Sequence, residues 1–281
     1  MKTNESKLDT KNLPKLFDLT GRIALVTGGA GLLGAEFCHT LAEAGAAVVV
    51  ADIDELGARK VAESIDAKGG KAISIVVDVT DSQSVKNMMD AALNTFPHLD
   101  ILVNCAALDP KFDPQHGGHT STFEDYPLEL WNQALSVNLT GAYLCCQAVG
   151  RIMQSQGGGV MINMSSIYGI TAPDQRLYQI PGEMPVYKPA YYPVTKAGIL
   201  GLTTYLAAYY AGKNIRVNAI SPGGVYNGHS DEFVKAYSAK TILGRMAYKD
   251  DMNGALLFLA SDASAYVTGA NIVVDGGWSV W

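Results

Sequence analysis

The sequence has little positive charge and no long hydrophobic run. Its 281 residues include 21 Lys and Arg against 27 Asp and Glu, which gives a net charge of −6 at pH 7. Because no basic excess attracts phosphate-rich surfaces, we expect neither nucleic acid nor a membrane surface as a partner. No apolar run approaches the roughly 18 residues of a membrane span, and the polar start lacks a signal-peptide core, so we expect a cytoplasmic protein.

Cysteine is also scarce, and the pattern of the cysteines excludes the common structural uses of thiols. They form neither a C-x-x-C pair nor a zinc-like grouping, and they lie in apolar or helical stretches. The four are Cys38, Cys105, Cys145 and Cys146. We therefore expect reduced core thiols and no metal site.

Apolar residues, in contrast, make up 48% of the chain, which is enough for a large core. The pattern predicts strands at 23–27, 46–51, 72–77, 100–104, 159–164, 215–220 and 271–274. It predicts helices at 32–44, 55–68, 82–95, 130–154, 190–211 and 250–261. Because the strands are apolar throughout, they indicate a parallel sheet that is covered on both faces. We predict one α/β domain over 19–281, a Rossmann-type doubly wound seven-stranded parallel sheet with helices on both faces, after a flexible tail at 1–18.

Ligands of such sheets bind beyond the carboxyl ends of the strands, so the segments that follow the strands are expected to carry function. Three of these segments are long or irregular: 106–129, 167–189 and 222–248. We expect them to form the substrate loops.

The first predicted strand runs directly into a glycine-rich turn and a helix. Gly28, Gly31 and Gly34 are spaced so that backbone can approach a pyrophosphate at the helix N-terminus. Glycines also occur where a strand merely packs tightly on a helix. Asp52 ends the second strand, close to the roughly 20-residue spacing of a carboxylate that binds the ribose 2′-hydroxyl. This carboxylate repels a 2′-phosphate, which favours NAD over NADP, although a strand-ending turn or a helix cap also explains an aspartate there.

A tyrosine and a lysine lie one helical turn apart in the segment AYYPVTKAG. Tyr192 and Lys196 can therefore face one pocket, where the ammonium is expected to lower the phenol pKa and make Tyr192 a proton carrier. A lysine that snorkels beside a half-buried tyrosine gives the same pattern. Ser166 follows the fifth strand, where it can bond a substrate oxygen or simply cap a turn.

These motifs together resemble the short-chain dehydrogenase/reductase family, in its compact single-domain branch. The resemblance runs from about Leu19 to Trp278. It rests on the glycine turn, Asp52, DV at 78–79, NCAA at 104–107, SVNLTG at 136–141, NMSS at 163–166, YPVTK at 192–196, NAISPGGV at 218–225, LGRMA at 243–247, FLASD at 258–262 and VDGG at 274–277.

The resemblance implies a role for each matching position. Ser166 orients the substrate oxygen, Tyr192 exchanges the proton, and Lys196 holds the nicotinamide ribose. Asn138 completes the catalytic set by anchoring a water in a proton relay, although an asparagine in a helix can also have no catalytic role. The implied cofactor contacts are Gly28, Gly31, Leu33, Gly34, Asp52, Asp78, Val79, Asn104, Ala106, Tyr192, Lys196, Pro222, Gly223, Val225 and Asn227.

The chain departs from the family pattern at several positions. The glycine motif reads TGxxGxxG, as in the extended branch of nucleotide-sugar epimerases and dehydratases, with Leu32 at the usual middle glycine. Only four residues follow VDGG, so we do not expect the further substrate domain of that branch. Asn227 replaces the usual threonine near the nicotinamide. Ser166 and Tyr192 are about twice as far apart as usual, so an insertion at 170–189 is expected to shape substrate choice.

The expected reaction is NAD-dependent hydride transfer between a secondary alcohol and its ketone. The alternatives are a nucleotide-sugar epimerase or dehydratase that recycles NAD, and a non-catalytic NAD-binding sensor. The loops favour a hydroxylated, carbohydrate-derived substrate, either neutral or anionic, unless their polar residues only face water. These residues are Lys111, His116, His119, Arg176, Tyr178, Tyr187 and Lys188. The helices at 130–154 and 190–211 are rich in apolar and aromatic residues. Because the resembled family usually forms dimers or tetramers through such helices, we expect a homodimer or homotetramer, unless these residues are buried within one subunit.

Overall fold

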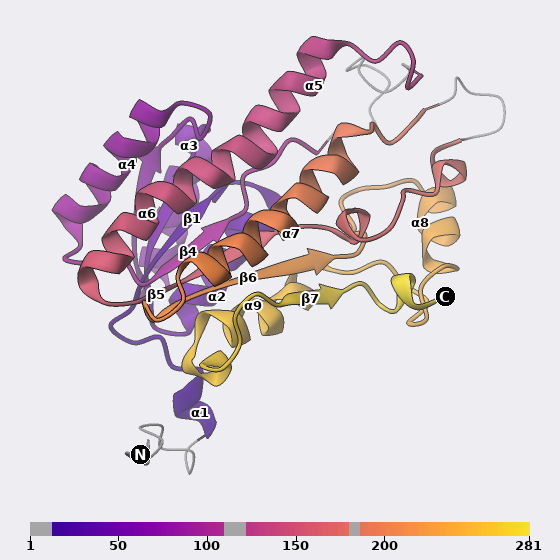
Figure 1. Ribbon diagram of the computed structural model, residues 1–281. Coiled ribbons are helices and arrows are strands. Elements are labelled where there is room, and N and C mark those ends of the chain that lie inside the picture. The colour runs from indigo at the N-terminus through magenta and orange to yellow at the C-terminus, as the bar shows by residue number, and fades with distance from the viewer. Residues whose placement is uncertain (1–12, 110–121, 180–185) are drawn as a thin grey trace, which may run out of the picture.

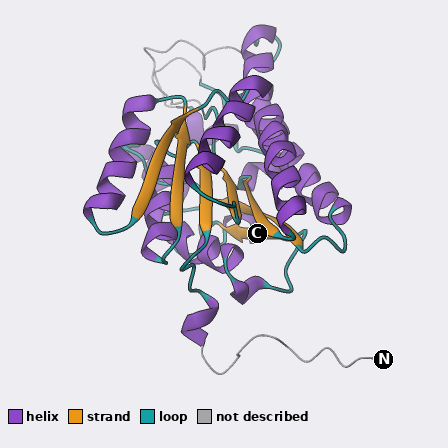
Figure 2. Ribbon diagram, turned by 90° about the vertical axis from the view of Figure 1, so that its left-hand side faces the viewer, coloured by secondary structure: helices purple, strands orange, loops and turns teal. Residues whose placement is uncertain are grey.

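A single parallel sheet of seven strands organises the chain (Figures 1 and 2). The computed structural model describes residues 13–109, 122–179 and 186–281. The strands are β1 (Ile23–Thr27), β2 (Ala47–Asp52), β3 (Lys71–Val76), β4 (Ile101–Asn104), β5 (Gly159–Met164), β6 (Ile215–Pro222) and β7 (Asn271–Val274). Their order is β3-β2-β1-β4-β5-β6-β7, with every neighbouring pair parallel. The doubly wound sheet predicted from the sequence is confirmed.

Helices cover both faces of this sheet, as Figure 2 shows. The helices are α1 (Leu13–Leu16), α2 (Leu32–Glu43), α3 (Glu55–Ala67), α4 (Ser82–Thr95), α5 (Leu128–Leu135), α6 (Ala142–Gln156), α7 (Tyr191–Tyr209), α8 (Asp231–Ser238) and α9 (Asn253–Ala260). Helices α2, α3 and α9 form one core layer with the sheet, and α4, α6 and α7 form the other. No helix in the described part of the chain is long and apolar enough to cross a membrane.

The alternation of side chains along each strand explains why both faces are apolar. In β1, Ala24 and Val26 pack in the α2 layer, whereas Ile23 and Leu25 pack in the α4 layer. All five residues of this strand are buried. A continuous apolar run is therefore the sequence signature of a strand that lies between two helical layers.

Two helical regions differ from the sequence prediction. The helix predicted at 130–154 begins earlier and contains a π-helical segment at Ser136–Gly141, between α5 and α6. Such segments are frequent at functional sites, and this one contains Asn138. The predicted loop 222–248 contains helix α8, whose N-terminus is capped by Ser230 through the backbone N–H of Phe233.

The carboxyl ends of the strands meet at one edge of the sheet, where the long segments also lie (Figure 1). Most of the predicted tail, residues 1–12, lies outside the described residues. The short helix α1 that follows it buries none of its residues, and Leu19 is the first buried side chain of the described chain.

Candidate active site

The glycine turn between β1 and α2 is packed so closely that side chains are excluded. A Cβ on Gly34 would lie 1.9 Å from the carbonyl oxygen of Gly28. A Cβ on Gly28, whose φ is +67°, would lie 2.7 Å from the backbone of Ala106 after β4. Gly31 caps α2, whose helix begins at Leu32 and continues through the half-buried Leu33. The turn is therefore a backbone cradle at a helix N-terminus, which fits a dinucleotide phosphate.

The carboxylate of Asp52 links the turn after β1 to the turn after β2. One oxygen accepts a hydrogen bond from the Ala30 backbone N–H at 2.9 Å, and the other accepts one from the Asp54 N–H at 2.9 Å. Each carboxylate oxygen can accept a second bond, so these contacts leave capacity for ribose hydroxyls. The turn-forming role of Asp52 and the cofactor role expected for it are therefore compatible.

The other residues expected near the adenosine follow β3 and β4. Asp78 accepts bonds from both the N–H and the hydroxyl of Thr80, and Val79 is buried near Gly141. The Asn104 side chain points inward, where its amide donates to Asn163 at 2.8 Å. Asn104 therefore has its backbone, and not its buried amide, at the edge of the sheet.

Three of the predicted catalytic side chains come together at the carboxyl end of β5. Ser166 is 7% exposed, and its hydroxyl accepts from the Tyr168 N–H at 3.1 Å. It is within reach of the Tyr192 phenol in the first turn of α7, whose pKa it lowers. The Lys196 ammonium lies 5.7 Å from the centroid of the Tyr192 ring and donates to the Met164 carbonyl at 2.9 Å. The one-turn spacing of tyrosine and lysine thus places both groups on one side of α7.

Burial dominates the acid–base properties of this group. It raises the pKa of Tyr192 well above 10.0, the negative charge of Asp109 raises it further, and the Ser166 hydrogen bond opposes both. Burial also lowers the pKa of Lys196. The net pKa of Tyr192 in the cofactor-free protein is therefore raised, because desolvation penalises the phenolate, and the lowering by Lys196 expected from the sequence stays a prediction.

Asn138 is 2% exposed and bonds both backbone groups of Leu108. Its side-chain oxygen accepts from the Leu108 N–H at 2.6 Å, and its amide donates to the Leu108 carbonyl at 3.0 Å. The amide also donates to the Thr195 hydroxyl at 3.3 Å, next to Lys196. Asn138 therefore links the loop after β4 to α7, whereas the water relay implied by the resemblance stays a prediction.

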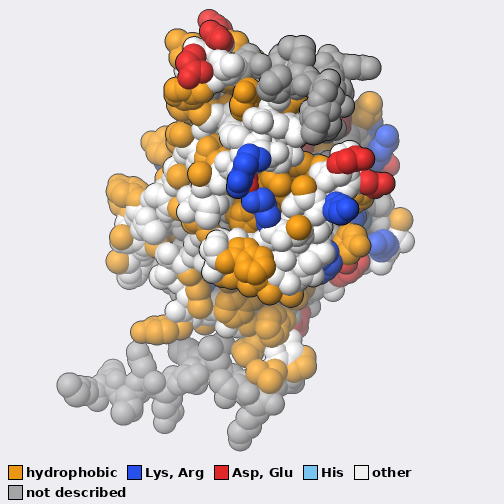
Figure 3. Space-filling view, turned by 90° about the vertical axis from the view of Figure 1, so that its right-hand side faces the viewer, with side chains coloured by type: hydrophobic (Ala, Val, Ile, Leu, Met, Phe, Trp, Pro, Cys, Tyr) orange, Lys and Arg blue, Asp and Glu red, His pale blue; other side chains and the backbone are white. Residues whose placement is uncertain are grey.

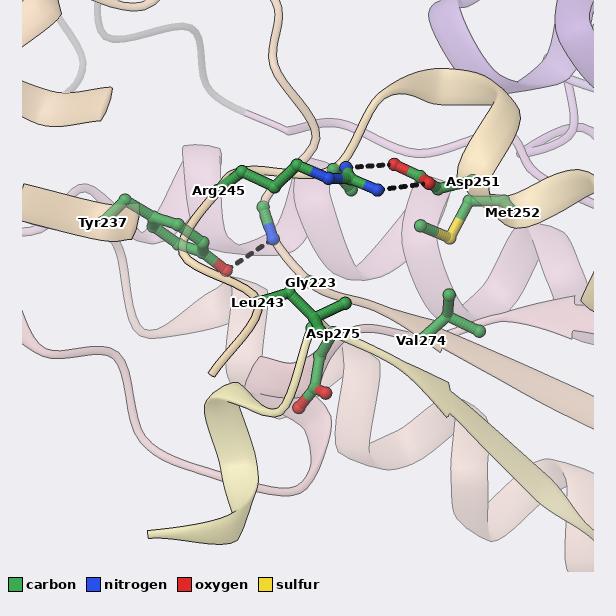
Figure 4. A pocket seen from close by; sticks show the side chains of 11 residues that line it. Gly223, Tyr237, Leu243, Arg245, Asp251, Met252, Val274 and Asp275 are labelled. Carbon is green, nitrogen blue, oxygen red and sulfur yellow. Dashed lines mark hydrogen bonds and ion pairs between the residues drawn. The ribbon is translucent and has the colours of Figure 1, made fainter. Parts of the chain in front are cut away.

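The expected nicotinamide frame follows β6. The Gly223 N–H donates to Val274 at 2.9 Å, Val225 pairs with Ala247, and Asn227 is exposed. A small cavity of about 100 Å³ lies behind this segment (Figure 4). The Tyr237 hydroxyl, which accepts from the Gly224 N–H, and the Arg245–Asp251 ion pair line it. These contacts hold the segment after Pro222 in place.

A cavity of about 710 Å³ lies between two of the predicted substrate loops. Its walls are Thr122, Phe123, Glu124, Tyr126, Leu128, Trp131, Ala172, Pro173, Gln175, Tyr187, Lys188, Pro189, Ala190 and Pro193. On the described part of the face at the carboxyl ends, basic and acidic side chains are interspersed among hydrophobic ones (Figure 3). Of the polar loop residues expected near a substrate, Lys188 and Tyr187 line this cavity. Lys111, His116 and His119 lie outside the described residues.

Arg176 and Tyr178 have other partners. Arg176 is ion-paired with Asp174, and the buried Tyr178 hydroxyl lies 2.8 Å from that of Tyr168. Two residues that the sequence reasoning missed are Asp109, which is ion-paired with Lys188 near Tyr192, and Gln175, which bonds the Lys188 backbone. Asp109 closely follows β4, and that position was the available signal.

The described residues contain no cluster of side chains that could bind a metal ion. No group of three or more His, Cys, Asp or Glu side chains there is placed to hold an ion. The four cysteines are free, and three of them are buried, whereas Cys105 is half-buried.

Known proteins match nearly the whole chain. A family model described as enoyl-(acyl carrier protein) reductase matches residues 29–279. A D-threitol dehydrogenase of Mycolicibacterium smegmatis is 35% identical over 269 residues, which are 94% of this chain and 95% of that protein. An NAD-dependent glycerol dehydrogenase of Listeria innocua is 31% identical over 278 residues, which are 96% and 98% of the two chains.

Solved structures agree with these matches. A short-chain dehydrogenase from Leptospira borgpetersenii with bound NAD+ is 34% identical, has a TM-score of 0.82 and is matched over 98% of each chain. A gluconate 5-dehydrogenase from Burkholderia cenocepacia in complex with NADP and tartrate is 29% identical, with a TM-score of 0.85 over 96% of this chain and 100% of its own. These relatives are named as dehydrogenases, and the glycerol dehydrogenase and both solved structures are named with NAD or NADP. The chain belongs to the short-chain dehydrogenase/reductase family and is an oxidoreductase that acts on alcohol groups.

Proposed function

We propose that this chain is an NAD-dependent dehydrogenase that interconverts a secondary alcohol of a polyol or sugar with its ketone. The observation that carries the proposal is the group formed by Ser166, Tyr192 and Lys196 at the carboxyl end of β5. It lies at the same edge of the sheet as the glycine cradle. A proton carrier and a dinucleotide site at one sheet edge are what hydride transfer requires.

Each side chain has a distinct task in this reaction. Ser166 holds the substrate oxygen by a hydrogen bond, and Tyr192 takes the hydroxyl proton in oxidation or returns it in reduction. Lys196 holds the nicotinamide ribose, and its positive charge favours the phenolate. The nicotinamide, when bound, accepts the hydride from the carbinol carbon or donates it to the carbonyl carbon.

The raised pKa of Tyr192 gives the two directions different pH optima. At neutral pH the phenol of the cofactor-free site is protonated, which suits proton donation during reduction. Oxidation needs the phenolate, so we expect it to accelerate as the pH rises.

The proposed preference for NAD rests on Asp52. Its carboxylate lies at the end of β2, where it accepts from the turn at Ala30 and retains capacity to accept from a ribose diol. The charge of the carboxylate opposes a 2′-phosphate. The glycerol dehydrogenase relative is named as NAD-dependent.

The polyol or sugar class is supported by the relatives, and the mainly apolar cavity adds a few hydrogen-bonding groups. Relatives are named for D-threitol, glycerol and galactose. Gln175, Lys188 and Glu124 bring hydrogen-bonding groups to the 710 Å³ cavity. The epimerase, dehydratase and sensor alternatives are not favoured, because these relatives are named dehydrogenases.

We also propose that the chain forms a homodimer or homotetramer through α6 and α7. Tyr143 on α6 and Tyr205 and Tyr209 on α7 are 48%, 64% and 60% exposed. Large exposed aromatic side chains on neighbouring helices are typical of interfaces. Light scattering of the purified protein tests this proposal, and a monomer at micromolar concentration contradicts it.

The function is tested by cofactor titration followed by a substrate panel. We expect NADH to bind more tightly than NADPH, and polyols or sugars to reduce NAD+. The Tyr192→Phe variant should lose about 10²- to 10⁴-fold in kcat while its NADH affinity is retained. Tyr266→Phe, which changes a fully exposed tyrosine, is the matched control and should keep its activity. Retained turnover in Tyr192→Phe contradicts the proposed mechanism.

A further inference from the structure

An ion pair from two distant loops lies against the reactive tyrosine. The Lys188 ammonium lies 4.1 Å from the centroid of the Tyr192 ring and is ion-paired with Asp109. The Lys188 side chain is only 6% exposed, whereas that of Asp109 is 56% exposed. Lys188 belongs to the insertion before α7, and Asp109 to the loop after β4. The pair therefore joins two of the long loops beside the proposed reaction centre.

Both ends of the pair are held by amide side chains that bond the backbone. Gln175 accepts from the Lys188 N–H at 2.9 Å and donates to the Lys188 carbonyl at 3.0 Å. Asn138 makes the same two-sided contact with Leu108, the residue before Asp109. The backbone N–H and C=O of Lys188 and of Leu108 are therefore all hydrogen-bonded. These bonds fix the positions from which the side chains of Lys188 and Asp109 approach each other.

The burial of Lys188 at this place needs a compensating contact. A buried ammonium is unfavourable unless a carboxylate or other acceptors face it, and Asp109 supplies the carboxylate. The second cation of the site, Lys196, is 5% exposed and is bonded to the Met164 carbonyl. The two opposite charges of the pair therefore determine what a substrate meets beside the Tyr192 ring.

Such a pair discriminates between neutral and anionic ligands. A neutral polyol can donate one hydroxyl to the exposed Asp109 carboxylate and accept at a neighbouring oxygen from Lys188. A substrate carboxylate at the same place meets the Asp109 charge and has to compete with it for Lys188. Repulsion from the Asp109 carboxylate, which water screens in part because its side chain is 56% exposed, offsets the attraction of a substrate carboxylate to Lys188.

We infer that Lys188 and Asp109 bind neighbouring hydroxyls of a neutral polyol or sugar, beside the carbinol that reacts at Tyr192, and discriminate against sugar acids. This inference rests on the proposed function and narrows its substrate class. It assigns two specificity residues that lie outside the family motifs of the chain.

The test compares D-threitol with D-gluconate as substrates of the full-length protein with NAD+. The parent enzyme should have the higher kcat/KM for threitol. Asp109→Asn leaves the ammonium without its carboxylate, so the threitol-to-gluconate ratio of kcat/KM should fall at least tenfold. Lys188→Met leaves the carboxylate without its cation, so the same ratio should rise, with a higher KM for both compounds.

A pair that only holds the loops together gives a different result. Both variants then lose activity toward the two substrates by the same factor, and the ratio stays constant. Lys68→Met and Glu43→Gln are the matched controls, because they break an exposed lysine–glutamate pair away from the site, and they should leave the ratio unchanged. An unchanged ratio in both site variants, or a parent enzyme that prefers gluconate, overturns the inference.

Calorimetric binding to the NADH complex separates this inference from the proposed function. Threitol that binds without turnover, and binds more weakly to Asp109→Asn, supports the inference and overturns the proposed function. Turnover of gluconate but not of threitol overturns the inference alone. The absence of both binding and turnover overturns both.

Discussion

The proposed active site has a cofactor half around the glycine turn and a substrate half around Lys188 and Tyr192, and different kinds of contact hold the two halves. In the cofactor half, backbone approaches backbone, as where a Cβ on Gly34 would lie 1.9 Å from the Gly28 carbonyl oxygen. In the substrate half, side chains make the decisive contacts, as where Gln175 holds the Lys188 backbone and Lys188 meets Asp109. Changes in the first half should therefore affect folding and cofactor binding, whereas changes in the second should affect selectivity.

The largest effect is expected for a methyl group in the glycine cradle. Gly34→Ala should lower the free energy of unfolding by about 3 kcal/mol or more, because the Gly28 carbonyl cannot move without disturbing the turn. Gly201→Ala is the matched control, since that helical glycine has no neighbour within 4 Å of an added Cβ. It should stabilise the protein by up to about 1 kcal/mol. Urea denaturation measures both, and equal effects of the two variants contradict the comparison.

The next effect concerns the choice of cofactor. Asp52→Asn keeps an oxygen for the turn but removes the charge that opposes a 2′-phosphate. The ratio of NADPH to NADH dissociation constants should fall by about tenfold or more, equivalent to roughly 1.4 kcal/mol. Fluorescence titration measures this ratio, and Asp54→Asn serves as the neighbouring control. An unchanged ratio means that Asp52 acts only as a turn residue.

A smaller effect is expected when the Gln175 clamp is removed, that is, the two hydrogen bonds of Gln175 that hold the backbone of the insertion at Lys188. Gln175→Leu loses two hydrogen bonds to the Lys188 backbone, which should cost about 1–2 kcal/mol of stability. The KM for the polyol should rise several-fold with little change in NADH affinity, because the clamp lies in the substrate half. Steady-state kinetics measures the KM, and titration with NADH measures the cofactor affinity. Weakened NADH binding in this variant shows that the two halves are coupled.

The smallest effect is a shift in the pH profile of alcohol oxidation. The charge of Asp109 raises the pKa of Tyr192 because it opposes a second negative charge on the phenolate. Asp109→Asn should therefore move the rising limb of kcat to lower pH. The charge control is Glu43→Gln, which should leave the profile in place. A shift toward higher pH shows that Asp109 acts through some contact other than its charge.

Much of the cofactor half could be predicted from the sequence, because its requirements are local. The positions of the glycines, Asp52 and the Tyr192–Lys196 spacing follow from turn, strand and helix geometry. The limits of the seven predicted strands agree with the structure to within two residues. The π-helical segment at Ser136–Gly141 and helix α8 could not be predicted, because short helices depend on packing and caps more than on periodicity.

The pKa of Tyr192 is a chemical property that the local sequence could not predict. The sequence indicated a phenol next to an ammonium, and this neighbour relation is present in α7. Whether the pKa rises or falls depends on burial, and residues from β5, the loop after β4 and the insertion together provide that burial. Burial thus raises the net pKa of Tyr192 in the cofactor-free protein, which the neighbouring lysine alone does not indicate.

The order of apolar runs determined the parallel sheet, because strand alternation acts over a few residues. The short motifs predict the edge at which ligands bind and the proton carrier, because helical spacing is equally local. Tertiary structure alone decided that Asp109 meets Lys188 beside Tyr192. Those two residues are 79 positions apart, and their meeting depends on how two loops are anchored by Asn138 and Gln175. Contacts over such separations arise from packing of the whole domain, which no local pattern encodes.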